Sequence, residues 1–247
     1  MSLPDRDELI ERYQPDRSRP GLRVNFISSA DGAVTLDGRS GGLGNPTDRI
    51  LFHLLRMFSD AILVGAGTAR AEGYGPVRLE EDALRWRRRA GLEAYPQMVL
   101  VSGRLDLDPA AALFTDAPRR PIVITHAASD DEQRDALGEV ANVLVHGVDR
   151  IDMIAALAEL RDHYGLGQIL CEGGPYLFGT LQHAGLVDEL CLTLAPILAG
   201  PGAGRITAAP PRADGASIEG PVADVQPMRL ASLLEADGAV FLRYVRP

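Results

Sequence analysis

The chain has 247 residues, of which 46% are hydrophobic and 24% are charged, and its formal net charge is −9. This composition is that of a folded globular protein and excludes a disordered chain. The negative charge argues against broad binding to nucleic acids or to anionic membranes. The length allows one large domain or two small ones.

The N-terminal residues mix charges early and contain no apolar stretch typical of a signal peptide. No uninterrupted apolar run reaches membrane-spanning length. Cys171 and Cys191 both lie in apolar runs, which indicates buried thiols rather than a disulfide or a metal pair. The five histidines show no metal-ligand spacing, so we predict no metal site. We expect a cytoplasmic protein.

Two apolar patterns alternate along the first half of the chain. Continuous apolar runs predict buried strands of a parallel sheet, and apolar residues three or four positions apart predict helices. The helix over 50–58 is expected to have Thr47 or Asp48 as its N-cap. In chain order, we expect a helical turn at 7–13, a strand at 22–29, a turn at 31–32, extended residues at 33–36, a glycine-rich loop at 37–44, the helix at 50–58, a strand at 61–64, a loop at 69–79, an exposed basic helix at 80–90, and strands at 97–101 and 121–125.

The second half continues the alternation and then changes to strands alone. Asp237-Gly238 between two strand-like runs is a strong hairpin signal. In chain order, we expect a polar helix at 130–137, a strand at 143–145, an amphipathic helix at 151–163, a strand, turn and helix at 168–181, a long strand at 187–196, a loop at 200–214, and strands at about 216–225, 228–235 and 239–245.

Strands that alternate with helices over the first two-thirds predict βα units and a mainly parallel sheet. We therefore predict an α/β fold of three layers (α/β/α), with a mixed, mainly parallel central sheet and a C-terminal antiparallel strand pair. No linker or internal repeat divides the chain. Residues 1–20 are expected to be an irregular lead-in and residues 21–247 a single domain.

The most informative stretch is QILCEGGPYLFGTL at residues 168–181. An apolar run stops at Glu172, and two glycines and Pro175 then open a helix. Pro suits a first helical position, and the exposed N–H groups of a helix start favour a phosphate. Local sequence alone leaves two interpretations open, an ordinary turn with a solvated Glu or a site that grips both a phosphate and a polar heterocycle.

Other candidate loops follow the remaining strands, where ligands bind in open α/β sheets. Gly65 and Gly67 precede Thr68, but this turn lacks the third glycine of a GxGxxG motif and the Lys of a P-loop. Ser102 and Arg104 carry donors that suit a ribose 2′-phosphate, although a turn serine and a solvated arginine are the simpler interpretation. Several such loops along one edge suit an extended dinucleotide.

Two acidic residues are candidates for chemistry. Glu172 ends a buried strand, where an unpaired carboxylate is costly, so it needs a donor from the protein or from a ligand. Glu72 lies in the loop predicted at 69–79, and long loops in compact domains tend to be functional.

Together these segments resemble the riboflavin-biosynthesis pyrimidine reductase family, whose fold is dihydrofolate-reductase-like. The resemblance covers about residues 22 to 200 in order. The segments that carry it are Ser29-Ala30-Asp31-Gly32, LLRMFSDAILVGAGTARAE at 54–72, Ser102 after its strand, ILCEGGPYLFGTL at 169–181, and GLVDELCLTLAPILAG at 185–200.

The resemblance implies hydride transfer from NADPH to a phosphoribosylaminopyrimidine. Glu172 and Glu72 become the candidate catalytic residues, which anchor the heterocycle or relay a proton. The expected substrate contacts are Ser40, Arg56, Pro76, Arg78 and Glu172, of which the two arginines suit a phosphate. The expected cofactor contacts combine the positions that the resemblance implies with the glycine turns and Arg104. They are Ser28, Gly42, Gly65, Gly67, Thr68, Ser102, Arg104, Gly173, Gly174, Pro175, Tyr176, Leu177 and Phe178.

The chain departs from the family pattern on the substrate side. The departures are Asn25 for a usual Lys, Ala33 for a basic residue, Gly42-Leu43 where Trp or Phe is common, Glu72 for Asp, and Gly73-Tyr74 for a residue followed by Pro. Two other functions therefore stay open, a dihydrofolate reductase-type activity on a pterin and a non-catalytic nucleotide-binding role. The family also implies a homodimer.

Overall fold

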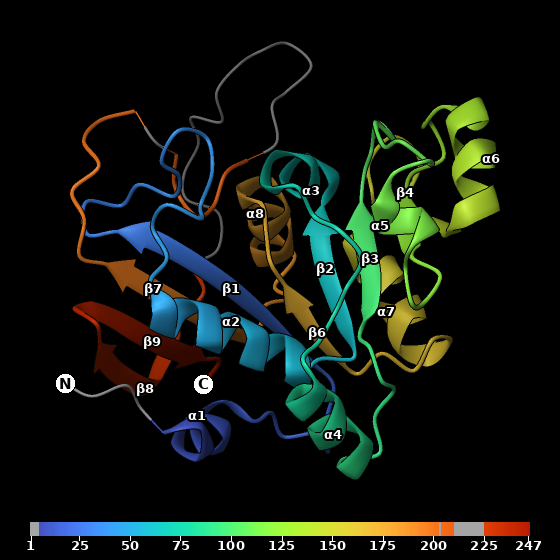
Figure 1. The fold of residues 1–247 in the computed structure, drawn as a ribbon. Coiled ribbons are helices and arrows are strands. Elements are labelled where there is room, and N and C mark those ends of the chain that lie inside the picture. The colour runs from blue at the N-terminus through green and yellow to red at the C-terminus, as the bar shows by residue number, and fades with distance from the viewer. Residues whose placement is uncertain (1–4, 203, 210–224) are drawn as a thin grey trace.

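The computed structural model describes residues 5–202, 204–209 and 225–247. Its centre is a nine-stranded sheet of order β5-β4-β3-β2-β6-β1-β7-β9-β8 (Figure 1). The strands are β1 Gly21–Ser29, β2 Ala61–Gly65, β3 Gln97–Val101, β4 Ile122–Thr125, β5 Asn142–Val145, β6 Gln168–Cys171, β7 Glu189–Ala195, β8 Arg229–Ala236 and β9 Ala239–Val245.

Strands β1 to β7 pair in parallel with one another, and β9 runs antiparallel to both β7 and β8. The predicted α/β class, with a mixed, mainly parallel sheet and a C-terminal antiparallel pair, is confirmed. The strand expected at about 216–225 falls almost wholly outside the described residues.

Helices cover both faces of the sheet. One apolar cluster joins β1, β2 and β6 to α7 and α8, and two others join the opposite face to α1, α2, α4, α5 and α6. Figure 1 shows α2 in front of the sheet and α7 behind it, as the three-layer prediction requires. The helices are α1 Arg6–Tyr13, α2 Pro46–Phe58, α3 Ala66–Glu72, α4 Glu81–Arg89, α5 Ala112–Thr115, α6 Asp131–Val140, α7 Met153–Asp162 and α8 Pro175–His183.

Helix α3 corrects the prediction of a loop at 69–79. It begins directly after β2, and its small buried residues Ala66 and Ala69 pack on the sheet. Gly73 ends it in the left-handed conformation, with φ +71. A helix so short, with alanines in place of large apolar residues, lacks the periodic pattern that signals a helix. The short helix α5 lacks it too and was not predicted.

The N-cap of α2 is also different from the predicted one. Asn45 fills this position, and its side chain accepts a hydrogen bond from the backbone N–H of Asp48 at 2.8 Å. The two residues predicted as caps tie the helix to the C-terminal strands instead. Thr47 donates to Asp237, and Asp48 accepts from Thr193, each at 2.8 Å.

Helix α4 is less exposed than its basic sequence indicates. Arg87 is fully buried and donates hydrogen bonds to the carbonyl oxygens of Met57, Ser59 and Glu93. Burial lowers the pKa of Arg87 to about 10. One arginine therefore ties α4 to the end of α2.

Residues 33–36, which were expected to be extended, form no strand of the sheet. Within this segment Leu36 makes only an isolated bridge with Arg39.

Candidate active site

The candidate site lies where strand order changes direction. From β2 the chain moves outward through β3, β4 and β5, and after β6 it continues to β7 on the other side of β1. Strand β6 therefore sits between β2 and β1 at a topological switch point, where open α/β sheets bind ligands beyond the carboxyl ends of the strands. Glu172 is the first residue after β6.

The turn between β6 and α8 is packed too closely to carry side chains. The N–H of Gly65, at the end of β2, donates to the carbonyl of Gly173 at 2.7 Å. A Cβ on Gly173, whose φ is +95, would lie 2.9 Å from Cζ of Phe26, and a Cβ on Gly174 would lie 2.2 Å from Oγ1 of Thr68. Gly173 therefore requires glycine, and Gly174 has no room for a side chain beside Thr68.

Helix α8 begins at Pro175 with Gly174 as its N-cap, and no side chain of the described residues accepts a hydrogen bond from its first turn. The backbone N–H groups there keep their capacity to bind an anion. The turn and helix start predicted from the sequence are thus present. Thr68, on α3, lies against the turn, as the distance to Gly174 shows.

Glu172 forms a buried cluster with two residues from other elements. Arg56, on α2, donates from Nε and Nη2 to the two carboxylate oxygens, each at 2.7 Å. The hydroxyl of Tyr74, in the loop after α3, donates to Oε2 at 2.9 Å. The Glu172 side chain is 1% exposed, so all three donors come from the protein.

The electrostatics of this cluster favour a fixed ion pair. Burial opposes the charge of Arg56, but the carboxylate of Glu172 outweighs this and raises the pKa of Arg56 above its ordinary value. Burial and the charge of Glu172 raise the pKa of Tyr74 well above its ordinary value. The guanidinium Cζ also lies 4.2 Å from the ring centroid of Phe52.

The other predicted substrate and catalytic residues form separate contacts. Glu72 is the last residue of α3 rather than part of a loop, and Oε1 accepts from the backbone N–H of Ser40 at 2.7 Å. It thereby ties the loop after β1 to α3. Arg78 is exposed and donates to the carbonyl of Asp116. Pro76 is half-buried in the same loop.

The predicted cofactor contacts divide into a central group and an outer one. Gly65, Thr68, Gly173 and Gly174 touch one another at the turn. Ser28 is buried at the end of β1. The outer positions are exposed Gly42, packed near Leu36, exposed Gly67, buried Ser102 and exposed Arg104 beyond β3, half-buried Pro175, exposed Tyr176, and buried Leu177 and Phe178 on α8.

Tyr74, Phe52 and Phe26 were not predicted as site residues. Phe52 and Phe26 look like ordinary apolar residues of a helix and a strand, and Phe26 stacks on Phe178 with ring centroids 5.3 Å apart. Tyr74 did carry a signal, because it is an aromatic residue between two glycines at a position where the chain departs from the family pattern.

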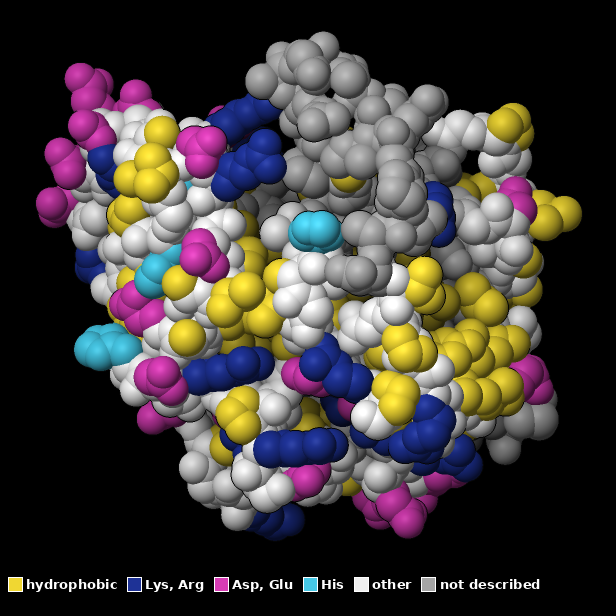
Figure 2. Space-filling view, turned by 180° about the vertical axis from the view of Figure 1, so that it is seen from behind, with side chains coloured by type: hydrophobic (Ala, Val, Ile, Leu, Met, Phe, Trp, Pro, Cys, Tyr) yellow, Lys and Arg dark blue, Asp and Glu magenta, His cyan; other side chains and the backbone are white. Residues whose placement is uncertain are grey.

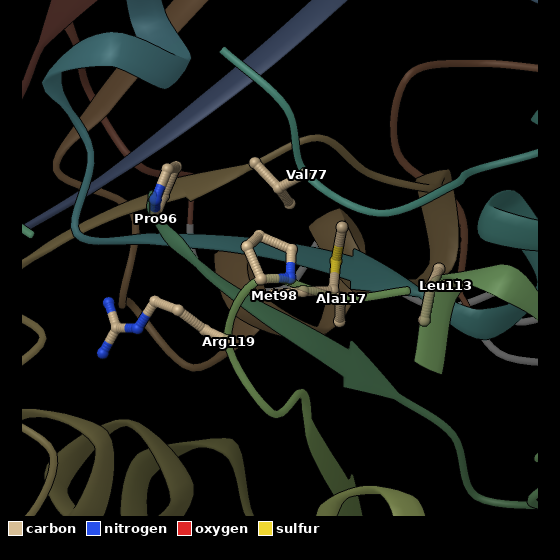
Figure 3. A pocket seen from close by; sticks show the side chains of 7 residues that line it. Val77, Pro96, Met98, Leu113, Ala117 and Arg119 are labelled. Atoms are coloured by element: carbon tan, nitrogen blue, oxygen red, sulfur yellow. The ribbon is translucent and has the colours of Figure 1, made fainter. Parts of the chain in front are cut away.

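A separate apolar depression opens beside the start of β3 (Figure 3). It is too tight to hold a water molecule, so it is no binding site. The residues that line this depression are Val77, Pro96, Met98, Leu113, Ala117, Pro118 and Arg119.

Among the described residues, no group of three or more His, Cys, Asp and Glu side chains could hold a metal ion.

The sheet order, the glycine turn and the buried carboxylate define a protein of the dihydrofolate-reductase-like α/β class. Residues 20–218 match the RibD C-terminal domain, and the chain belongs to this family. It is 30% identical over 183 residues to the 2,5-diamino-6-ribosylamino-4(3H)-pyrimidinone 5′-phosphate reductase of Archaeoglobus fulgidus, covering 74% of this chain and 83% of that one. It is 29% identical to the riboflavin biosynthesis protein RibD of Mycobacterium tuberculosis over 76% of this chain but only 45% of that one.

Solved structures agree. A pyrimidine reductase-like protein of Corynebacterium diphtheriae matches with a TM-score of 0.82 and 31% identity, covering 96% of this chain and 97% of that one. The riboflavin biosynthesis reductase Rib7 of yeast matches with a TM-score of 0.67 and 16% identity, covering 98% and 99%. A dihydrofolate reductase of Enterococcus faecalis, with a TM-score of 0.50 and 11% identity, shares the fold over 92% and 96% of the two chains. Over the residues that the structure describes, no helix has the length and hydropathy to cross a membrane.

Proposed function

We propose that this chain is an NADPH-dependent reductase of riboflavin biosynthesis. Its substrate is a pyrimidine of the 5-amino-6-(5-phosphoribosylamino)uracil type, whose ribosylamino group is reduced to a ribitylamino group. The observation that carries the proposal is the glycine turn before the uncapped start of α8, directly beside the buried Glu172 cluster. Backbone N–H groups that suit an anion thus lie next to a buried polar cluster at the switch point. The named relatives support the same reaction class.

The residues at the turn fit a nicotinamide dinucleotide. The approach of Gly174 to Thr68 leaves backbone rather than side chains at the start of α8, which suits a diphosphate. We assign Thr68, Gly173, Gly174 and the first turn of α8 to the cofactor phosphates. Ser102 and Arg104 we assign to the ribose 2′-phosphate that distinguishes NADPH from NADH. When bound, NADPH supplies the hydride.

The protein's own part in the reaction is mainly positioning. Arg56, Arg78, Ser40 and Pro76 are proposed to hold the pyrimidine and its ribose phosphate. Glu172 keeps the guanidinium of Arg56 in place through two hydrogen bonds of 2.7 Å. We propose that Glu72 or Glu172 passes a proton through water to the acceptor nitrogen. We propose that the protein acts in the cytoplasm.

A steady-state screen of NADPH oxidation tests this function. The substrates are the deaminated and the non-deaminated ribosylaminopyrimidine phosphates, with dihydrofolate beside them. Oxidation with at least one pyrimidine, and weaker oxidation with NADH, is the expected result. An enzyme that binds NADPH but oxidises it with none of the three would contradict the proposal and revive a non-catalytic role. Activity only with dihydrofolate, blocked by antifolates, would establish the pterin alternative, which at present has the fold likeness alone in its support.

We further propose a homodimer formed through the C-terminal strands. Leu233 on β8 is paired with Leu242 on β9, which in turn is paired with Leu192 on β7, so the three side chains share a face. Leu230 and Leu233 are 46% and 54% exposed. Apolar side chains gather over this edge of the sheet (Figure 2). In the part of the chain that the structure describes, β8 is also the edge strand, whose free side can pair with another strand. A second copy of the chain would cover both the apolar side chains and the backbone groups of β8.

Leu233→Glu is therefore expected to convert a dimer into a monomer, because it places a charge in the apolar contact. Light scattering should show the mass falling from twice 26.5 kDa to 26.5 kDa. Ile154→Glu is the matched control, since Ile154 is exposed on α7, away from this edge. A wild-type protein that is monomeric at micromolar concentration would contradict the proposal.

A further inference from the structure

Tyr74 has no part in the function proposed so far, although it touches the centre of the site. The left-handed Gly73 ends α3, and the N–H of Tyr74 then donates to the carbonyl of Ala69 at 2.8 Å. This fixed turn brings the Tyr74 hydroxyl to within 2.9 Å of Glu172. The residue is placed by backbone geometry, which is how positioning residues are typically held.

The carboxylate of Glu172 has little capacity left for a ligand. It accepts two hydrogen bonds from Arg56 and one from Tyr74, and its side chain is 1% exposed. Both oxygens of the carboxylate therefore already accept hydrogen bonds from the protein. Direct contact between Glu172 and a heterocycle would require it to give up one of these donors.

Arg56, in contrast, keeps donors on its other edge. Its Nε and Nη2 face Glu172, while Nη1 finds no acceptor in the part of the chain that the structure describes. The Arg56 side chain is 15% exposed, and its Cζ lies 4.2 Å from the ring centroid of Phe52 and 5.6 Å from that of Tyr74. A guanidinium held by a carboxylate on one edge and by aromatic contacts keeps the N–H groups of Nη1 available for a further acceptor.

We propose that Tyr74 is a positioning residue that locks Glu172 onto Arg56, so that Nη1 of Arg56 donates to a carbonyl oxygen of the substrate's heterocycle and not to its phosphate. This inference rests on the proposed function and specifies the part of the substrate that the cluster binds. The raised pKa of Tyr74 is consistent with a hydroxyl that stays protonated and keeps donating.

The charge of the Arg56–Glu172 pair determines whether Nη1 of Arg56 binds a carbonyl or a phosphate of the substrate. The carboxylate of Glu172 already balances the charge of Arg56 at 2.7 Å, so the ion pair has no net charge. A phosphate dianion at Nη1 would also approach the carboxylate, whose repulsion is strong in a buried setting. A neutral carbonyl oxygen accepts the same N–H without that repulsion. Arg78 is exposed, and among the described residues its side chain donates only to a backbone carbonyl, so it remains the arginine suited to the phosphate.

The test compares a ribosylaminopyrimidine 5′-phosphate with its dephosphorylated form. Tyr74→Phe and Arg56→Lys are each expected to lower kcat/KM about tenfold or more, by the same factor for both substrates. Arg78→Gln should lower it only for the phosphorylated substrate. Tyr95→Phe, the same change before β3 and away from the cluster, should change neither. Losses for Tyr74→Phe or Arg56→Lys that vanish with the dephosphorylated substrate would overturn the inference.

A second readout needs no turnover. The Nε–H of Arg56, assigned by its loss in Arg56→Lys, should give a slowly exchanging NMR signal that shifts and exchanges faster in Tyr74→Phe but not in Tyr95→Phe. An unchanged signal would show that Tyr74 does not hold the pair and would overturn the positioning role. Wild-type inactivity with every pyrimidine would instead count against the proposed function, while the NMR result would still decide the role of Tyr74.

Discussion

Replacing Glu172 by glutamine is expected to lower kcat/KM for pyrimidine reduction by about 100-fold, a loss of about 2.7 kcal/mol in transition-state stabilisation. The amide has one acceptor oxygen where the carboxylate has two, so its NH2 group must face a donor of Arg56 or of Tyr74. The guanidinium also loses its counter-charge in a buried setting. Arg56 would then no longer be held in one orientation for the substrate.

The same change is expected to destabilise the fold, since removing one partner of a buried ion pair costs about 3–5 kcal/mol. Thermal melts and NADPH binding must therefore accompany the kinetics. Glu189→Gln is the matched control, because Glu189 also accepts two hydrogen bonds from an arginine, Arg243 on β9, but lies at the start of β7, away from the glycine turn. It should lower the stability of the fold without lowering turnover. Unchanged turnover in Glu172→Gln would mean that the carboxylate has no role in the reaction.

The strands of the sheet were predictable because of where they lie. Central parallel strands are buried on both faces, so they appear as continuous apolar runs. The run at 97–101 has the same bounds as β3, and the run at 61–64 is one residue shorter than β2. Helix α3 was missed because its packing depends on the small size of Ala66 and Ala69, a property that no apolar periodicity reports.

The candidate site also has parts that the sequence predicts and parts that it does not. The turn at Gly173 and Gly174 could be predicted because strand, glycines and Pro175 are consecutive in sequence. The partners of Glu172 could not, because Arg56 is 116 residues away and Tyr74 is 98. Their contacts depend on how α2 crosses the sheet and on how Gly73 directs the loop after α3. The need of Glu172 for a donor was correctly inferred from burial, but the identity of that donor is a property of the fold.

Gly174→Ala is expected to weaken NADPH binding at least tenfold. The backbone of Gly174 is extended, with φ −82 and ψ −169, so alanine can adopt it. The obstacle is contact, because the new Cβ would lie 2.2 Å from Oγ1 of Thr68. Relieving that overlap must move α3 or the turn, at a cost on the order of 1–3 kcal/mol. The dissociation constant for NADPH and the melting temperature measure the two effects.

A second substitution shows whether the clash is the cause. Thr68→Ala removes Oγ1 and leaves the Cβ of residue 68 at 3.6 Å from the new methyl group, an ordinary contact. The Thr68→Ala/Gly174→Ala protein should therefore bind NADPH as well as Thr68→Ala alone, a strong positive coupling between the two sites. Gly173→Ala should find no such rescue, because φ +95 is unfavourable for any side chain. If the double variant bound NADPH no better than Gly174→Ala, the close approach of α3 to the turn would not be what shapes the cofactor site.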